Sequence, residues 1–173
     1  MTTAAGARKA RSSGPNTRVS VGQEAAGQAS PLSLLAKGRG GSAADRAIAF
    51  LEALRISEGR KAGAPLRLAE FQRRFVRGAL ADGVAVACLS IGRGNGKTAL
   101  TAGLALGALV GAWDDQPKRE IIFAARNRDQ AKIAYSFLVG FIETMPEDDQ
   151  ALFTIRRGSK LEVEFEGHGG GLA

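Results

Sequence analysis

The chain has 173 residues, of which 45% are hydrophobic and 24% charged, and its formal net charge is +7. This length allows one ordinary domain, and the composition is typical of a globular protein rather than a disordered, fibrous or disulfide-rich one. Apolar runs such as residues 84–91 are far shorter than the roughly 20 residues needed to cross a bilayer, so we expect no membrane partner. One cysteine, Cys88, and one histidine, His168, exclude a disulfide framework and disfavour a zinc site.

Most of the positive charge lies in the first quarter of the chain. Residues 1–43 contain six basic residues and one acid, whereas the rest is nearly balanced, with 18 basic and 16 acidic groups. This segment is rich in Gly, Ala, Ser and Thr and has no aromatic residue, so it cannot bury enough apolar surface to offset the entropy lost on ordering. We expect a disordered basic arm, with a short helical turn at 31–37. Its role is either that of a solubilising tail or that of a weak attractant for DNA.

Two amphipathic helices are predicted after the arm. Apolar residues recur at helical spacing over 43–56, with Ser42 as the N-cap, and again over 69–81. A turn at Asp82 and Gly83 follows the second helix. These two helices would precede the first strand of the domain.

Two continuous apolar runs, residues 84–91 and 121–125, have the length of strands. Such runs are typical of strands that are covered on both faces in a parallel sheet. In this interpretation Cys88 is a small core residue. Two further short strands are predicted at 151–156 and 161–165, with the last residues of the chain unstructured.

Helices are predicted over 96–110, whose small residues suit close packing on a sheet, and over 128–145, where Pro146 ends the helix. The order of strand, glycine-rich loop, helix, strand and helix is typical of an α/β domain. We therefore predict a doubly wound α/β fold with a mostly parallel sheet flanked by helices. Three carboxylates alternate along the last strand, which indicates a solvated edge strand more than a metal site.

The clearest chemical signature joins the first predicted strand to its helix, where residues 90–98 read Ser-Ile-Gly-Arg-Gly-Asn-Gly-Lys-Thr. Glycines let the backbone wrap around phosphate oxygens, and a helix N-terminus adds unpaired N–H donors and a favourable dipole. Lys97 would reach the β- and γ-phosphates, and the Thr98 hydroxyl would bind Mg²⁺. The alternative is a plain strand-to-helix turn. The predicted loop for a nucleoside triphosphate consists of Gly92, Arg93, Gly94, Asn95, Gly96, Lys97 and Thr98. With this loop, the predicted α/β fold is P-loop NTPase-like.

The loop departs from the common G-x-x-x-x-G-K-[ST] pattern, because Ile91 stands where the first glycine would be. Arg93 lies inside the loop, four residues before Lys97. Its guanidinium either pairs with charge that develops on the γ-phosphate during transfer or is simply an exposed loop arginine. Arg93 and Lys97 are therefore the candidate catalytic residues.

With its neighbours, this loop resembles that of the large subunit of tailed-phage terminases, the ATP-driven motor that packages viral DNA. In that family the first glycine is commonly lost and an arginine stands four residues before the lysine, as it does in residues 93–98. Upstream, residues 65–72, Pro-Leu-Arg-Leu-Ala-Glu-Phe-Gln, are similar to the family's adenine-recognition segment. The resemblance implies that Gln72 contacts the adenine edge, since an amide both donates and accepts. Alone, Gln72 is a polar residue on an amphipathic helix.

The resemblance extends over about residues 44–166. Residues 124–131 look like the segment after the family's second strand, although Asn127 and Asp129 there fit helix caps equally well. The resemblance implies ATP and Mg²⁺ as cofactors, and double-stranded DNA, the terminase small subunit and the portal protein as partners. It also implies the cytoplasm of a bacterial host cell, in a phage or prophage context, and a homo-oligomeric ring for the complete protein.

An ATPase of this type needs an acidic pair after an apolar strand, to hold Mg²⁺ and to activate the attacking water. No such pair follows Thr98, because residues 147–149 are acidic but follow no apolar strand and are typical of a loop. The family carries this pair and a metal-binding nuclease further along. We therefore expect an incomplete fold, with residues 44–173 as the N-terminal portion of a P-loop ATPase domain. Whether it hydrolyses ATP alone stays open.

Two other functions compete with this one. The chain fits a fragment of another P-loop helicase or translocase, because such motors also pair an upstream glutamine with a phosphate loop. It also fits a non-catalytic remnant that binds DNA through the basic arm at 1–43, in which case binding would depend on salt and not on ATP.

Overall fold

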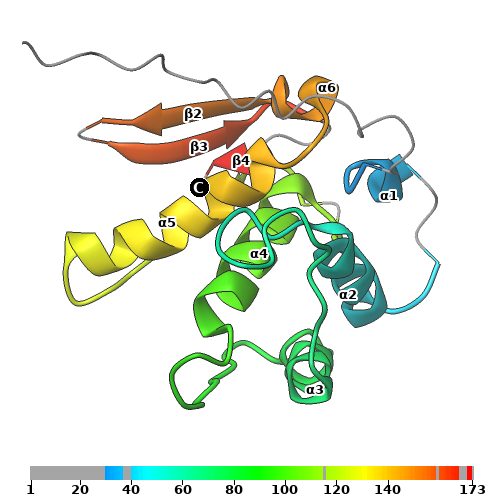
Figure 1. Ribbon diagram of the computed structural model, residues 1–173. Helices are drawn as coiled ribbons and strands as arrows, with labels where there is room; N and C mark the ends of the chain where they lie inside the picture. The colour runs from blue at the N-terminus through cyan, green and yellow to red at the C-terminus, as the bar shows by residue number, and fades with distance from the viewer. Residues whose placement is uncertain (1–29, 37–39, 115, 159, 168–170, 173) are drawn as a thin grey trace, which may run out of the picture.

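The computed structural model describes residues 30–36, 40–114, 116–158, 160–167 and 171–172. These residues form helices and strands arranged around one core (Figure 1). In chain order the elements are α1 (Ser33–Ala36), α2 (Ala43–Ala53), α3 (Glu70–Ala79), α4 (Lys97–Val110), β1 (Arg119–Glu120), α5 (Arg128–Glu143), α6 (Glu147–Gln150), β2 (Phe153–Arg157), β3 (Leu161–Phe165) and β4 (Gly171–Leu172).

The predicted basic arm falls mainly on residues 1–29 and 37–39, which lie outside the described residues. The part that is described contains α1, so the predicted helical turn at 31–37 is confirmed. Leu32 and Leu35 pack against the hydrophobic core. The predicted turn therefore packs on the folded domain, while the prediction of disorder for the rest of the arm stays a prediction.

The longer helices lie close to their predicted ranges, because their ends are set by local capping. At the start of α2, Ser42 Oγ accepts a hydrogen bond from the Asp45 N–H (3.1 Å) and the Asp45 carboxylate accepts one from the Ser42 N–H (3.3 Å). At the start of α5, the Asn127 side-chain oxygen accepts from the Gln130 N–H (3.0 Å). Ser42 is thus the predicted N-cap, and Asn127 is a helix cap.

The sheet is mixed and has the strand order β1-β4-β3-β2. β1 pairs with β4 in parallel, whereas β3 is antiparallel to both β2 and β4. The prediction of a mostly parallel sheet is therefore wrong for the described residues. The physical reason is the short connection between β2 and β3, which permits only an antiparallel hairpin. This hairpin matches the two short strands predicted near the end of the chain, and β4 lies where the last residues were expected to be unstructured.

The two apolar runs that were predicted as buried strands are not strands. Residues 84–91 have no strand partner, and Val86 is 86% exposed. Cys88, predicted to lie in the core, is exposed as well. In the second run Ile122 is 75% exposed, and pairing stops at β1 just before it. Backbone N–H and C=O groups of a buried strand need partners on neighbouring strands. Among the described residues, no strand pairs with either run.

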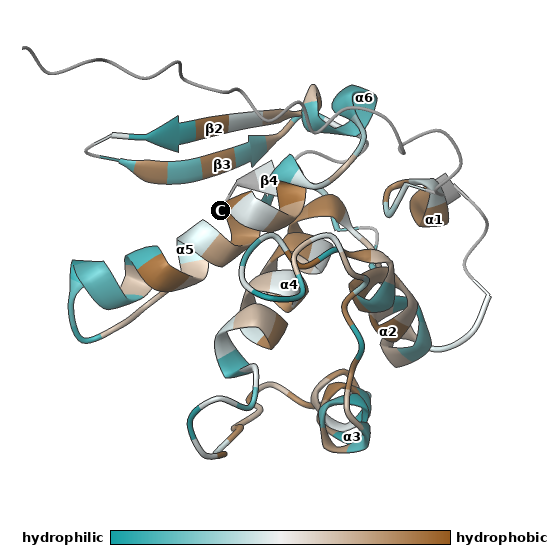
Figure 2. Cartoon of the chain, in the orientation of Figure 1, coloured by the Kyte–Doolittle hydropathy of each residue, from teal (hydrophilic) through white to brown (hydrophobic). Residues whose placement is uncertain are grey.

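β3 carries its carboxylates on one face, but it is not the solvated edge strand that was predicted. It lies between β2 and β4, and Glu162 is only 5% exposed. Glu162 forms ion pairs with Lys160 (2.7 Å) and Arg156 (2.8 Å), and these cations hold its pKa below the ordinary value. The alternation along β2 and β3 is visible in Figure 2. The opposite face of β3 joins the core through Leu161, Val163 and Phe165.

Helix α4 lies at the centre of the core and packs against both α2 and α5 (Figure 1). The approach is close at Gly103, where a Cβ atom would lie 2.6 Å from Leu51 Cδ2 and 3.7 Å from Phe141 Cε2. At Gly107 a Cβ atom would lie 3.0 Å from Phe50 Cδ1. These small residues were predicted to pack on a sheet. They admit Leu51 and Phe50 of α2, Phe141 of α5 and the Trp113 ring, while α4 also contacts β1 and β4.

Replacing Gly103 by alanine should lower the free energy of unfolding. Overpacking of this kind costs about 1–3 kcal/mol, which exceeds the ~0.5–1 kcal/mol that a helix gains on replacing glycine by alanine. The matched control is Gly78→Ala in α3, where a Cβ atom would meet nothing within 4 Å and stability should rise. Urea denaturation measures both. A Gly103→Ala variant as stable as the control would show that Leu51 moves aside without cost.

Candidate functional site

The loop that precedes α4 is shaped by two glycines in the left-handed conformation. Gly94 has φ +79° and Gly96 has φ +71°, values that other residues rarely adopt. Gly96 is also the N-cap of α4, so the first N–H groups of this helix are open toward the loop. Asn95 Nδ2 donates to the Gly92 carbonyl (3.3 Å) and closes the turn. The result is a compact loop at a helix N-terminus, which suits an anion.

The loop is tied to α3 by one side chain, Gln72. Its Oε1 accepts a hydrogen bond from the Ala69 N–H (2.9 Å), and its Nε2 donates to the Asn95 carbonyl (3.1 Å). Gln72 is only 9% exposed, so these bonds are largely shielded from water. An amide side chain has two N–H donors and two acceptor lone pairs, so one of each remains for a ligand.

Two hollows flank the loop, and residues of the loop line both of them. The first has a volume of about 430 Å³ and is lined by Gly92, Arg93, Gly94, Asn95, Gly96, Lys97, Thr98, Ala99 and Phe137. The second, of about 460 Å³, lies on the side of α3 and includes Phe71, Gln72 and Arg67. Residues 94–96 line both hollows. The structure thus brings the residues of the predicted site together along two adjoining hollows.

The three side chains predicted to act on phosphate lie in the first hollow. Lys97 Nζ donates to the Ile91 carbonyl, so the amine is folded back over the loop. Thr98 is half-buried in the first turn of α4. Arg93 is exposed, and it has no hydrogen bond or ion pair with another described residue. All three are accessible to a ligand, and their roles in binding and catalysis stay predictions.

Sequence reasoning missed a second support of the site, Glu52 on α2. Its Oε1 accepts from Arg73 Nη2 of α3 (2.6 Å) and from the Leu68 N–H (3.3 Å). Glu52 therefore joins α2 both to α3 and to the segment that lines the second hollow. The only signal in the sequence was an acid and a base on neighbouring amphipathic helices, 21 residues apart, and no spacing rule relates such a pair. The function of Gln72 as a tie between α3 and the loop was missed for the same reason.

Acidic side chains are absent from both hollows among the described residues that line them. Within the described ranges, no group of three or more His, Cys, Asp and Glu side chains is arranged to hold a metal. Residues 147–149, predicted to be a loop, belong to α6 instead, and Asp149 accepts a hydrogen bond from the Ser30 hydroxyl. A metal near the loop would therefore rely on the Thr98 hydroxyl and on oxygens of the ligand itself.

Comparison with known proteins assigns a class: the chain belongs to the family of phage terminase large subunits. One similar protein is the terminase large subunit of Enterobacteria phage HK97, which is 37% identical over 120 residues, or 68% of this chain and 24% of that protein. The crystal structure of the HK97 bacteriophage large terminase matches with a TM-score of 0.65 and 28% identity. This match covers 76% of the chain and 26% of the solved one.

The chain spans about a quarter of the length of these relatives. No protein-family profile matches it. Within the part of the chain that the structure describes, no helix is both long and apolar enough to span a membrane. The resemblance to terminases inferred from the loop and its neighbours is confirmed, and the α/β class of the fold is confirmed with it.

The tie between α3 and the loop predicts a stability effect that needs no ligand. Gln72→Ala should lower the free energy of unfolding by about 1–3 kcal/mol, because it leaves a shielded N–H and a shielded carbonyl unpaired. Hydrogen exchange at the Ala69 amide should also accelerate. The matched control is Gln130→Ala, an exposed glutamine on α5 whose side chain has no partner among the described residues. Equal stability of the two variants would contradict the assignment.

Proposed function

We propose that this chain carries the ATP-binding loop of a terminase large subunit, in a P-loop NTPase-like arrangement. The observation that supports this proposal is the loop at residues 92–98, which separates two hollows at the N-terminus of α4. One hollow offers a lysine, a hydroxyl and backbone N–H groups, as a triphosphate requires. The other offers an aromatic ring and a buried amide, as a base requires. A nucleotide that lies across the loop would occupy both.

In the first hollow, Lys97 would leave the Ile91 carbonyl and bind the β- and γ-phosphates. This exchange is favourable because a phosphate oxygen carries a full negative charge and a carbonyl does not. The Thr98 hydroxyl would hold Mg²⁺ together with phosphate oxygens. Arg93, exposed and without a partner among the described residues, would extend toward the γ-phosphate.

In the second hollow, Gln72 would select the base. Its remaining N–H and its remaining lone pair match an edge of adenine that presents one acceptor and one donor. Phe71 lines the same hollow and is half-buried, which suits packing against an aromatic base. Because Gln72 also holds the loop through Asn95, bound adenine would reinforce the position of the phosphate-binding residues.

The complete protein would use this site as the motor that packages viral DNA by coupling ATP hydrolysis to translocation. Its partners would be double-stranded DNA, the terminase small subunit and the portal protein, in the cytoplasm of the bacterial host. A homo-oligomeric ring is proposed on the same basis. Support for this wider role comes from membership of the terminase family and from the described loop.

Lys97→Ala should weaken the binding of Mg-ATP by about 30-fold, since a hydrogen bond from a charged group contributes ~2 kcal/mol. Isothermal titration calorimetry with the purified chain measures the dissociation constant. The control is Lys132→Ala, which removes an exposed lysine on α5 that lines neither hollow. The proposal fails if both variants bind Mg-ATP as tightly as the unchanged chain, or if the unchanged chain does not bind it.

The purified chain should bind Mg-ATP without turning it over. No Asp or Glu among the described residues lines either hollow, so water has no carboxylate to activate it. Phosphate release by the chain should equal that of its Lys97→Ala variant. Steady-state release well above this background would reveal a general base outside the two hollows.

A further inference from the structure

The segment that leads into α3 is paired with the chain at the end of α2. The Ile56 N–H donates to the Ala64 carbonyl (2.9 Å), and the Leu66 N–H donates to the Leu54 carbonyl (2.8 Å). These two hydrogen bonds flank one antiparallel bridge. Ile56 and Leu66 also line the second hollow, on the side of α3. A wall of this hollow is therefore attached to the C-terminal end of α2.

Glu52 extends this pairing by one step with its side chain. In the same antiparallel register, the Leu68 N–H would donate to the backbone carbonyl of residue 52. Residue 52 belongs to α2, however, so its backbone follows the helix and leaves the ladder. The carboxylate oxygen Oε1 of Glu52 accepts from the Leu68 N–H instead (3.3 Å). Leu68 is buried, and a buried N–H needs an acceptor within the protein.

The same carboxylate oxygen holds α3 through Arg73, whose Nη2 lies 2.6 Å from Glu52 Oε1. The Glu52 side chain is only 21% exposed, and an ion pair that is partly shielded from water is screened less than an exposed one. Arg73 Nε is buried and has no hydrogen-bond partner among the described residues. Within the described part of the chain, the Arg73 guanidinium therefore depends on Glu52.

Helix α3 packs beside α2 and is held from two directions (Figure 1). Arg73 binds Glu52 of α2, and its neighbour Gln72 binds the Asn95 carbonyl of the loop (3.1 Å). Consecutive side chains leave a helix about 100° apart, so a contact at one of them fixes the direction of the other. The ion pair between Glu52 and Arg73 thus sets the rotation of α3 about its axis and, with it, the direction of the Gln72 amide.

The contacts of Glu52 are confined to one side of the loop. Its two partners belong to α3 and to the segment before it, and Leu68 lines the second hollow. Glu52 itself lines neither hollow. It has no printed hydrogen bond or ion pair with the residues of the first hollow, which belong to the loop, the start of α4 and α5. A change at Glu52 would therefore act on the second hollow first.

We propose that Glu52 is the positioning residue of the second hollow, and that it sets the affinity which the base adds to a bound nucleotide. It touches no ligand and acts through the Leu68 backbone and the direction of Gln72. The triphosphate in the first hollow does not depend on it. This inference rests on the proposed function, because it assigns the second hollow to the base.

The test compares Mg-ATP with Mg-tripolyphosphate, an inorganic ligand that has the phosphate chain and lacks the nucleoside. Glu52→Ala should weaken the binding of Mg-ATP about tenfold, as the loss of one hydrogen bond to the base would, and should change the binding of Mg-tripolyphosphate by less than about twofold. Glu52→Gln keeps an oxygen for the Leu68 N–H but removes the charge that faces Arg73. Its affinity for Mg-ATP should lie between those of the unchanged chain and the alanine variant. Isothermal titration calorimetry with the full chain measures all of these dissociation constants.

Glu143→Ala is the matched control, because it also removes a helical glutamate that is paired with an arginine, Arg157, and lines neither hollow. It should bind both ligands as the unchanged chain does. The glutamine variant preserves the shape of the Glu52 side chain, so it carries the comparison alone if the alanine variant does not fold.

Two results overturn the inference and leave the proposed function intact. One is an equal loss of affinity for both ligands in the Glu52 variants, which is the result expected of a merely structural residue. The other is an unchanged ratio of the two dissociation constants in variants that bind both ligands as the unchanged chain does. If the unchanged chain binds neither ligand, the proposed function fails and this inference fails with it.

Discussion

The structure depends on the close packing of α4 against α2 and α5. At Gly103 the helices approach so closely that a single methyl group would overlap with Leu51, and Leu100, Leu106 and Leu109 of α4 are fully buried. α4 begins at Lys97, directly after the glycine that ends the loop. Because a packed helix is rigid, the direction of its first N–H groups is set by contacts more than one turn away from the site. The packing of the core therefore also fixes the orientation of the candidate site.

A second set of contacts holds the loop from the side of α3. Gln72 binds the Asn95 carbonyl, while Glu52 of α2 holds Arg73 and the Leu68 N–H. The start of α4 thus fixes the direction in which the loop faces, and the hydrogen bond from Gln72 fixes how far the loop lies from α3. A ligand that binds across it would contact both supports, so binding would stabilise the folded state by an amount that grows with ligand concentration.

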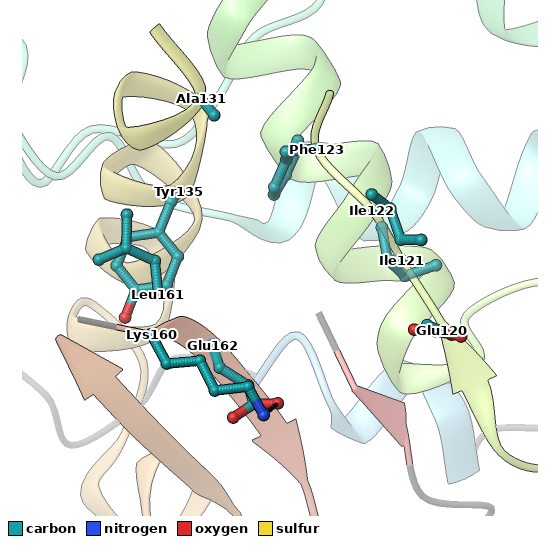
Figure 3. A pocket seen from close by; sticks show the side chains of 9 residues that line it. All are labelled: Glu120, Ile121, Ile122, Phe123, Ala131, Tyr135, Lys160, Leu161 and Glu162. Carbon is teal, nitrogen blue, oxygen red and sulfur yellow. Dashed lines mark ion pairs between the residues drawn. The ribbon is translucent and has the colours of Figure 1, made fainter. Parts of the chain in front are cut away.

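The sheet, in contrast, leaves two apolar segments of the described chain without a paired strand. Residues 84–91 belong to no strand and are mostly exposed, and residues 121–123 line a hollow opposite residues 160–162 (Figure 3). Both segments are apolar, and apolar strands are stable only when both edges are paired and both faces covered. The described residues form the helices that support the loop and a four-stranded sheet.

Local patterns were sufficient to predict α2, α5 and the strands of the hairpin, because capping and alternation act within a few residues, as at Ser42 and Asn127. The glycines and Lys97 also identified the loop, since its chemistry is contained in nine consecutive residues. Strand pairing, the two hydrogen bonds of Gln72 and the burial of Glu162 depended on the tertiary structure alone. An apolar run such as residues 84–91 indicates that the segment is suited to burial. Whether the run pairs as a strand depends on segments that are distant in the sequence.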